Sequence, residues 1–333
     1  MRTQETVKPI DVVGIGNAIV DVLVQVDDAF LTKHSLAKGN MQLIDEQQSQ
    51  KLLSEIKTPI KASGGSAANT LAGLSQLGAR AEFIGRVRND NLGLSFTNDI
   101  KAVGASFNTP AAKSGPPTAH CLIFITPDAQ RTMCTYLGAS IFLEPKDLNL
   151  SIIKESKLLY LEGYLWDSPA AKEAFIKAAD TCKKNNGKIA LSLSDSFCVE
   201  RHRESFINLV EEYVDFVFAN EDEMVSLYKA KGLKSAMRSL KGKCETAIIT
   251  KGAEGSVIIN GDLEINIKPY ILGDLKDTTG AGDLYAAGFL YGLINKKDYK
   301  ICGEIGSICA GQIITQLGTR SNVSLKELID NHS

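Results

Sequence analysis

Short apolar segments alternate with longer amphipathic segments along the second half of the chain. Residues 157–161, 188–193 and 214–219 are apolar runs of strand length, and each is followed by a segment with helical spacing. This alternation predicts a parallel sheet with helices on both of its faces. In such sheets ligands bind beyond the carboxyl ends of the strands, where Glu162 and Asp195 stand in this sequence.

The same pattern predicts most of the other elements. Strands are expected at 10–16, 22–26, 41–44, 82–87, 120–125, 131–136, 244–250, 256–260 and 263–268, and helices at 46–56, 91–103, 168–185, 201–212 and 299–317. The strands 120–125 and 131–136 flank a turn that contains Pro127 and Asp128, so they are expected to form a hairpin.

Composition and charge exclude several classes of protein. Of the 333 residues 44% are hydrophobic and 23% are charged, which indicates a globular chain of one large domain with an appendage, or of two domains. The formal net charge of −2 gives no indication of binding to nucleic acid or to an anionic membrane. No apolar run is long enough to span a bilayer, and residues 1–8 lack the apolar core of a signal peptide. The seven cysteines are scattered without a Cys-x-x-Cys pair, which fits a reducing cytoplasm better than a disulfide framework.

Residues 277–290 carry the strongest candidate chemistry. Gly280, Ala281 and Gly282 lie where a polar turn becomes an apolar helix, and the first N–H groups of a helix have no partner inside it. Such a helix start binds anions. Asp283 places a carboxylate beside this anion site, where it would suit a general base that takes a proton from an attacking hydroxyl. A glycine-rich helix start with a capping aspartate is the alternative interpretation.

Taken whole, residues 277–290 resemble the C-terminal signature of the ribokinase-like (PfkB) family of sugar and nucleoside kinases. The resemblance extends over nearly the whole chain. It implies a ribokinase-like three-layer αβα sandwich with a mostly parallel central sheet and a small β-sheet lid. It also implies that Asp283 is the catalytic base, that Gly280, Ala281 and Gly282 stabilise the transferring phosphoryl group, and that ATP is the co-substrate.

The substrate-binding residues follow from two further motifs. Residues 63–70, with Gly64, Gly65 and Asn69, open a helix and resemble the N-terminal glycine motif of the family, which holds substrate hydroxyls. The resemblance assigns Asn17 and Asp21 to the same site. Without the family, Asp21 reads equally well as a turn residue. The alternative for residues 63–70 is a serine-capped helix after a glycine loop.

A lid is expected from residues 17–45 and 113–137, inserted in the α/β core of a single kinase domain. Arg131, on the predicted hairpin, resembles the arginine of the family that meets substrate or phosphate when the lid closes. A solvated turn arginine is the alternative. The sequence does not decide whether the protein forms a homodimer, as some members of the family do through the lid.

The resemblance places the nucleotide and its metal ions as well. Asn220 and Glu223 match a motif that organises Mg²⁺ through water, although a helix capping box explains their spacing equally well. Thr250 and Gly252 match the nucleotide loop, and Thr279 would lie beside the phosphates. Asp277 and Thr279 correspond to residues that hold a monovalent cation, here expected to be K⁺, with Gly318 as a further carbonyl ligand.

The acceptor is expected to be adenosine, phosphorylated at its 5′-hydroxyl to AMP in purine salvage. The segments 14–21, 118–121 and 191–197 resemble adenosine kinases more than fructokinases, and a sugar such as ribose or fructose is the alternative. Two other classes of protein are alternatives. A Gly14-x-Gly16 dinucleotide site lacks the third glycine and a following helix. A catalytically inactive homologue would not need Asp283.

Overall fold

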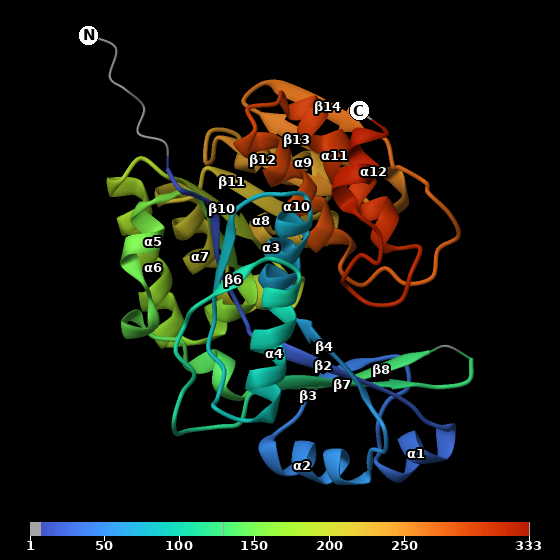
Figure 1. Ribbon diagram of the computed structural model, residues 1–333. Helices are drawn as coiled ribbons and strands as arrows, with labels where there is room; N and C mark the ends of the chain where they lie inside the picture. Colours follow the sequence, from blue (N-terminus) through green and yellow to red (C-terminus); the bar gives the residue numbers. More distant parts are fainter. Residues whose placement is uncertain (1–7, 129, 333) are drawn as a thin grey trace.

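A large twisted sheet forms the centre of the computed structural model, which describes residues 8–128 and 130–332 (Figure 1). Within these residues its nine strands follow the order β14-β13-β12-β11-β10-β9-β1-β5-β6. The strands are β1 Ile10–Ile15, β5 Ala81–Ile84, β6 Ser106–Phe107, β9 Ser156–Glu162, β10 Lys188–Ser192, β11 Phe216–Asn220, β12 Thr246–Thr250, β13 Ser256–Asn260 and β14 Leu263–Ile267. Only the pairs β12–β13 and β13–β14 are antiparallel in this sheet, so the prediction of a mostly parallel sheet is confirmed.

Helices cover both faces of this sheet, as predicted. One face carries α3 Ser66–Gln76, α4 Asn91–Ala102, α10 Ala281–Ile294, α11 Tyr299–Ile313 and α12 Leu325–Asp330. The other carries α5 Leu150–Lys154, α6 Pro169–Lys184, α7 Ser196–Glu212, α8 Glu221–Tyr228 and α9 Leu233–Leu240. Ser168 caps α6 and Pro169 occupies its first turn, as the sequence predicted.

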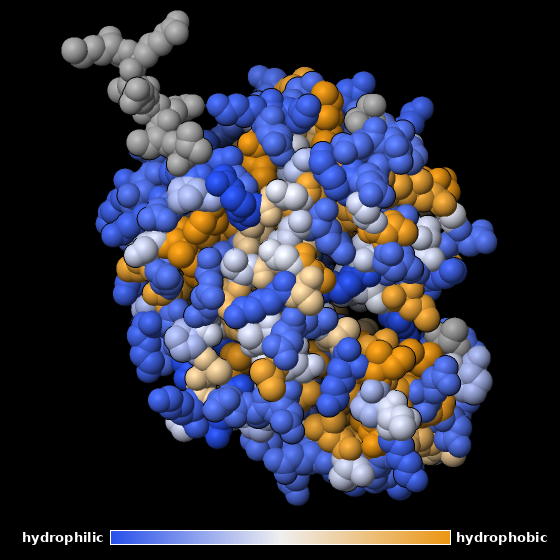
Figure 2. Space-filling model, in the orientation of Figure 1, coloured by the Kyte–Doolittle hydropathy of each residue, from blue (hydrophilic) through white to orange (hydrophobic). Residues whose placement is uncertain are grey.

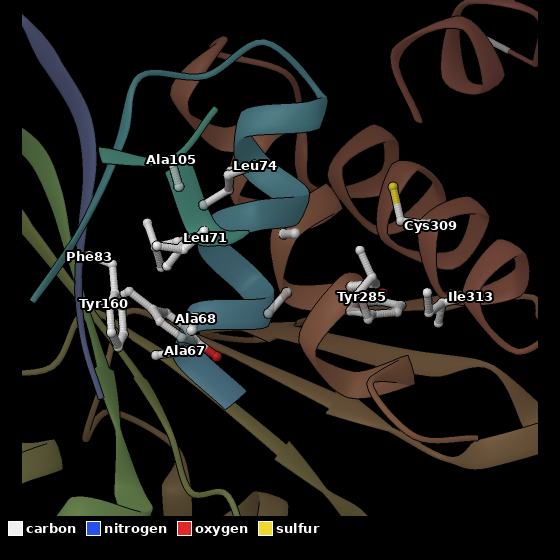
Figure 3. Packing of buried hydrophobic residues seen from close by; sticks show 14 of the residues in the cluster. Ala67, Ala68, Leu71, Leu74, Phe83, Ala105, Tyr160, Tyr285, Cys309 and Ile313 are labelled. Carbon is white, nitrogen blue, oxygen red and sulfur yellow. The ribbon is translucent and has the colours of Figure 1, made fainter. Parts of the chain in front are cut away.

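Successive residues of the central strands pack into two separate hydrophobic cores, one on each face of the sheet. Leu158 packs into the core on the α10 side of the sheet, whereas Leu159 packs into the core on the α6 side. This alternation follows from the two-residue period of a strand. Figure 3 shows part of the first core, where Leu71 and Leu74 of α3 lie beside Phe83 and Tyr160 of the sheet.

Among the described residues, a second sheet projects from the large domain (Figure 1). It has five strands in the order β3-β8-β7-β2-β4. Its strands are β2 Ile19–Gln25, β3 Met41–Leu43, β4 Ile60–Gly64, β7 Ala119–Ile125 and β8 Arg131–Tyr136. The helices α1 Asp28–Lys33 and α2 Glu46–Glu55 pack on its outer face. The predicted hairpin is confirmed, because β7 and β8 pair antiparallel with His120 opposite Tyr136. Residue 129 of its turn lies outside the described residues, as do residues 1–7.

Several elements differ from the expectations. Strand β4 adds residues 60–64 to the small sheet, outside the segments 17–45 and 113–137, and pairs antiparallel with β2. Helix α7 begins at Ser196 and bends at His202, where the predicted helix began at 201. Helix α11 ends at Ile313, short of the expected 317. The pattern did not predict α1, α5, α9, α12 or β6, which are short. The connections also contain 3₁₀ turns at Gly138–Phe142, Pro145–Asp147, Gly163–Asp167 and Gly252–Glu254.

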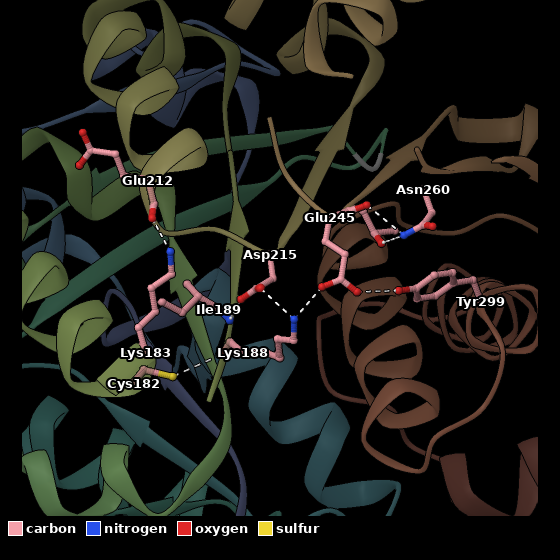
Figure 4. A network of polar contacts seen from close by, with 10 residues as sticks. Cys182, Lys183, Lys188, Ile189, Glu212, Asp215, Glu245, Asn260 and Tyr299 are labelled. Carbon is pink, nitrogen blue, oxygen red and sulfur yellow. Dashed lines mark hydrogen bonds and ion pairs between the residues drawn. The ribbon is translucent and has the colours of Figure 1, made fainter. Parts of the chain in front are cut away.

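Polar side chains tie the strands together at the end of the sheet opposite the small sheet (Figure 4). Lys188 of β10 bridges Asp215 and Glu245 at 3.0 and 2.7 Å. Glu245 also accepts a hydrogen bond from the Tyr299 hydroxyl at 3.1 Å, which connects β12 to α11. Their distance from the carboxyl ends of the strands indicates a structural role.

Candidate active site

A cavity of about 710 Å³ opens where the two sheets meet. The small sheet contributes Ile19, Asp21 and Thr135 to its wall, and the large domain contributes Glu162 and Asp283. Figure 2 shows the surface hollowed between the two parts of the molecule. Most of the predicted substrate and nucleotide residues therefore line one continuous space at the carboxyl ends of the parallel strands, whereas Gly64, Arg131 and Gly252 lie outside its lining.

The start of α10 faces this cavity. Gly280 is the N-cap and adopts a left-handed backbone with a φ of 80°, which costs glycine little. The N–H of Ala281 already donates to the carbonyl of Thr278 at 3.1 Å. Among the described residues, the N–H groups of Gly282 and Asp283 have no such partner, so they are the donors available to an anion.

Two side chains from α3 hold the carboxylate of Asp283. The Ser66 hydroxyl donates to Oδ1 at 2.6 Å, and the Asn69 amide donates to Oδ2 at 2.9 Å. The Thr319 hydroxyl donates to Asn69 Oδ1 at 3.0 Å, which orients the amide so that its NH₂ group points at Asp283. Burial raises the pKa of Asp283, and these hydrogen bonds oppose that increase. The carboxylate is thus fixed in position yet poised to accept a proton.

The two glycines of residues 63–70 leave room for neighbouring groups of the substrate site, including Asp21. A Cβ on Gly64 would lie 2.6 Å from Asp21 Oδ2, so only glycine leaves room for this carboxylate. Gly65 has a φ of 96°, and a Cβ there would lie 2.2 Å from the Asn17 carbonyl oxygen. Burial raises the pKa of Asp21 to about 6, while the charges of Arg320 and Arg131 lower it.

Glu162 joins two of the chain connections between the large domain and the small sheet. Asn17, between β1 and β2, donates to Glu162 Oε1 through its amide at 2.8 Å and its backbone N–H at 3.2 Å. Ala67, just after β4, donates its N–H to Oε2 at 2.8 Å. Burial raises the pKa of this carboxyl to about 7. Asn17 is therefore held by Glu162 at the cavity wall, with its Oδ1 left without a partner.

Arg131 reaches from the small sheet to the loop before α10. Its guanidinium forms an ion pair with Asp277 at 2.6 Å and lies 3.4 Å from the Thr279 hydroxyl. Asp277 also accepts hydrogen bonds from Thr279 and from the N–H of Gly318. In this conformation Arg131 places its positive charge beside the two residues expected to hold a monovalent cation.

Asn220 and Glu223 form a complete capping box at the start of α8. Asn220 Oδ1 accepts from the Glu223 N–H at 2.8 Å, and the Glu223 carboxylate accepts from the Asn220 backbone at 3.0 Å. Both residues also line the cavity, as does Thr250 at the end of β12. Gly252 has a φ of 56° and open space around its Cβ position, which leaves its backbone accessible.

The polar groups at this end of the cavity suit a hydrated magnesium ion. Burial raises the pKa of Glu223 to about 7, and Asp195 adds to the increase, so a nearby cation would favour the ionised carboxylate. Across residues 8–128 and 130–332, no group of three or more His, Cys, Asp or Glu side chains is arranged to hold a metal directly. Mg²⁺ would therefore be held mainly by water and phosphate oxygens, which it accepts readily.

The dinucleotide alternative is wrong. After Gly14 and Gly16 the chain continues into strand β2, so no helix start is available for a pyrophosphate. A Cβ on Gly14 would lie 2.3 Å from Leu71, and one on Gly16 would lie 2.4 Å from Glu162. These glycines allow close packing against α3 and Glu162.

The sequence profile of the pfkB family of carbohydrate kinases matches residues 35–326. The chain belongs to this family. It is a phosphotransferase with an alcohol group as acceptor. None of the described helices is both long enough and apolar enough to cross a membrane.

Solved structures of this pfkB fold superpose over nearly the whole chain. Adenosine kinase from Sinorhizobium meliloti is 42% identical with a TM-score of 0.90, covering 97% of this chain and 99% of the other. A probable sugar kinase protein from Rhizobium etli CFN 42 is 40% identical with a TM-score of 0.90, covering 98% and 99%. The ribokinase-like fold prediction is confirmed.

Curated pfkB-type relatives are more distant. Adenosine kinase of Saccharomyces cerevisiae is 27% identical over 328 residues, covering 91% of this chain and 94% of its own length. A 5-dehydro-2-deoxygluconokinase of Bacillus licheniformis is 28% identical over 264 residues, covering 76% and 81%. The relatives thus share the kinase reaction but differ in acceptor.

Sequence reasoning did not select three polar residues of the site for a role. Ser66 lies inside the predicted glycine motif. A serine at a helix start is common there as a capping residue, so it does not by itself indicate a catalytic role. Thr319 and Arg320 follow the predicted helix 299–317 and belong to no motif that the sequence indicates. Their contacts with Asn69, Ala68 and Ser63 join segments about 250 residues apart, and no local pattern reveals such contacts.

Proposed function

We propose that the protein is an ATP-dependent nucleoside kinase that phosphorylates the 5′-hydroxyl of adenosine to give AMP. The observation that carries the proposal is Asp283, held by Ser66 and Asn69 at a helix start whose free N–H groups face the same cavity. The 42% identity to the Sinorhizobium meliloti adenosine kinase, over almost the full length of both chains, supports the choice of acceptor.

In the proposed reaction Asp283 accepts the proton of the acceptor hydroxyl as the oxygen attacks the γ-phosphorus of ATP. The bond from that phosphorus to the β–γ bridging oxygen breaks, and ADP leaves with the electron pair. The N–H groups of Gly282 and Asp283 stabilise the negative charge on the transferring group. Asp21 and Asn69 orient the sugar hydroxyls, because both lie on the cavity wall beside Asp283.

ATP would lie along the wall formed by Asn220, Glu223, Thr250 and Thr279. Bound Mg²⁺ supplies positive charge to the phosphates, and Glu223 would hold it through water. The proposed K⁺ site at Asp277 and Thr279 requires Arg131 to leave its present ion pair. Arg131 would then be free to contact the phosphates or the acceptor, as the family resemblance implies.

Apolar side chains beside the acceptor residues would suit a nucleobase. Met41 and Leu43 of β3 line the cavity with 52% and 61% of their surface exposed, and Phe197 lines it with 69% exposed. A planar base resting there would remove this apolar surface from water.

The acceptor is tested by ADP release with Mg²⁺ and K⁺ in the presence of adenosine, inosine, ribose, fructose or 5-dehydro-2-deoxygluconate. Adenosine should give the highest kcat/KM, with AMP as the phosphorylated product. A sugar kinase is the second candidate, favoured by the 40% identity to the Rhizobium etli protein. Turnover of a sugar with none of adenosine would establish that alternative.

The base is tested by Asp283→Asn, which keeps the shape of the side chain but removes its ability to accept a proton. We expect kcat to fall by ~10²–10⁴-fold, the usual contribution of a general base. ATP binding measured by calorimetry should persist, because the substitution leaves the backbone N–H of residue 283 and the residues assigned to the nucleotide unchanged. Turnover near that of the native enzyme would remove Asp283 from this role.

A further inference from the structure

Arg320 connects the C-terminal segment to the substrate-binding turn. It follows the end of α11, and its guanidinium donates through Nη1 to the Ala68 carbonyl at 3.0 Å and through Nη2 to the Ser63 hydroxyl at 2.8 Å. Ser63 and Ala68 lie on either side of Gly64 and Gly65, the glycines that make room for Asp21. Its Nε is buried and has no hydrogen-bond partner.

The charge of Arg320 is buried without a direct ion pair. Among the described residues no carboxylate lies within ion-pair distance of its guanidinium, although Asp99, Asp21 and Asp283 all act on it electrostatically. Burial lowers the pKa of Arg320 to about 10, so the side chain stays positive at neutral pH. A charge buried in this way is costly.

The three carboxylates stand on different elements around this charge. Asp99 lies on α4 and accepts a hydrogen bond from the Ser63 N–H at 2.5 Å. Asp21 lies on β2 in the small sheet, and Asp283 lies in the first turn of α10. Two of these three carboxylates therefore have proposed roles in the reaction: Asp21 in acceptor binding and Asp283 in proton transfer.

We propose that Arg320 is a positioning residue whose buried positive charge favours the ionised forms of Asp21 and Asp283 while its hydrogen bonds hold the Gly64–Gly65 turn against the C-terminal segment. This inference rests on the proposed roles of Asp21 and Asp283. It extends them by assigning the electrostatic support of both carboxylates to one side chain that does not line the cavity.

The effect on the two carboxylates has a definite direction. Burial raises the pKa of both, and Arg320 lowers the pKa of each. Other groups act on the same pair. Those within electrostatic reach are Tyr160 and Glu162 on β9, Tyr164 after β9, Glu223 on α8, Cys121 on β7 and Arg131 on β8. Of the residues named here, only Arg131 and Arg320 are cations, and Arg131 is already paired with Asp277.

The experiment compares Arg320→Gln with Asp99→Asn in the full-length protein. Arg320→Gln removes the positive charge but keeps hydrogen-bond donors. The acidic limb of the kcat/KM profile should move up by about one pH unit or more, the usual effect of an opposite charge. Asp99→Asn removes a competing negative charge and keeps an acceptor for Ser63, so the limb should move down.

Controls separate charge from geometry. Ser63→Ala removes the Nη2 contact without changing any charge, and we expect a larger KM with the acidic limb in place. Arg320→Lys keeps the charge and should retain the native limb. If Arg320→Gln does not fold, the downward shift in Asp99→Asn decides the question. An unmoved limb in every folded variant that changes a charge would overturn the proposal.

A second measurement needs no substrate. NMR titration of the ligand-free protein with ¹³C-carboxyl-labelled aspartate follows Asp21 and Asp283 directly. Their midpoints should rise in Arg320→Gln and fall in Asp99→Asn. If no acceptor is turned over but these midpoints shift, the proposed function fails while the electrostatic role stands. If adenosine is turned over and the midpoints stay fixed, the role of Arg320 fails alone.

Discussion

At the scale of single residues, hydrogen bonds decide which of the polar side chains can act. Asp283 is aimed into the cavity by Ser66 and Asn69, and Asn69 is itself oriented by Thr319. The sequence indicated Asp283 and Asn69 because their motifs are local. It did not indicate Thr319, whose only signal is a contact 250 residues away in the chain.

Gly282 allows a test of the anion site by a single methyl group. A Cβ at this position meets no protein atom within 4 Å, so Gly282→Ala should fold with an unchanged melting temperature. The methyl would occupy the space beside the free N–H groups, where the phosphoryl group is expected. We predict a fall in kcat/KM of about tenfold or more, since misplacement by ~1 Å can cost 10²-fold.

The matched control is Gly232→Ala, which also adds a methyl with nothing within 4 Å but lies at the start of α9. Its ADP-release rate should equal that of the native enzyme. Equal rates for both variants would mean that the phosphoryl group does not approach Gly282.

At the scale of elements, α10 and α11 place the anion site by packing closely against each other. Gly288 of α10 lies against the backbone of Ile305 and Gly306, and Gly292 lies against Cys302. Helix α10 is apolar on nearly every side, as expected for a helix buried between the sheet, α3 and α11. Tyr285 of α10 and Cys309 and Ile313 of α11 appear together in Figure 3.

Gly288→Ala should destabilise the protein. A Cβ there would lie 2.7 Å from the Ile305 carbonyl oxygen and 2.8 Å from Gly306 Cα, and backbone cannot move aside as a flexible side chain can. We expect a loss of about 1–3 kcal/mol in the free energy of unfolding, as for other overpacked sites. Urea unfolding measures it, with Gly282→Ala as the reference. An unchanged midpoint would mean that the helices separate at little cost.

The small sheet shows where element prediction was limited. Its hairpin β7–β8 was predicted because both strands are apolar and flank a clear turn. Strand β4 was not, because Lys61, Ala62, Ser63 and Gly64 have low strand propensity, and its pairing with β2 supplies the order. The closing motion of the lid stays a prediction, although the Arg131–Asp277 ion pair is a contact that closure or opening would change.

At the scale of the whole molecule, the active site concentrates carboxylates that burial makes harder to ionise. Burial raises the pKa of Asp21 to about 6 and those of Glu162 and Glu223 to about 7. In the unfolded chain such groups titrate near pH ~4. The folded protein therefore binds more protons than the unfolded chain between about pH 4 and pH 7.

This difference predicts that stability falls as pH rises. Each raised carboxyl contributes stability that is complete below its unfolded pKa and is lost as pH rises through its folded pKa. The free energy of unfolding should decrease by up to about 1.4 kcal/mol per pH unit for each such group between pH 5 and pH 7. Urea unfolding of the ligand-free protein at several pH values measures this slope.

Glu162→Gln is the variant that isolates one contribution to this slope. Its amide cannot titrate, so the decrease between pH 5 and pH 7 should be shallower than in the native protein. The same variant loses one acceptor for Asn17 or Ala67, which lowers stability equally at every pH. An identical slope in the two proteins would show that Glu162 does not carry the raised pKa.

The sequence by itself determined the class of fold and the order of the motifs. Apolar periodicity is local, so it predicts a parallel sheet, and glycines beside Asp283 indicate an anion site without knowledge of the tertiary structure. Only the tertiary structure decided which groups meet. Glu162 joins Asn17 to Ala67 and Arg131 reaches Asp277, because folding brings distant segments within a few ångströms. Arg320 acts electrostatically on Asp21 for the same reason. Burial then shifts the pKa values of the carboxyl groups among them, and burial exists only in the packed molecule.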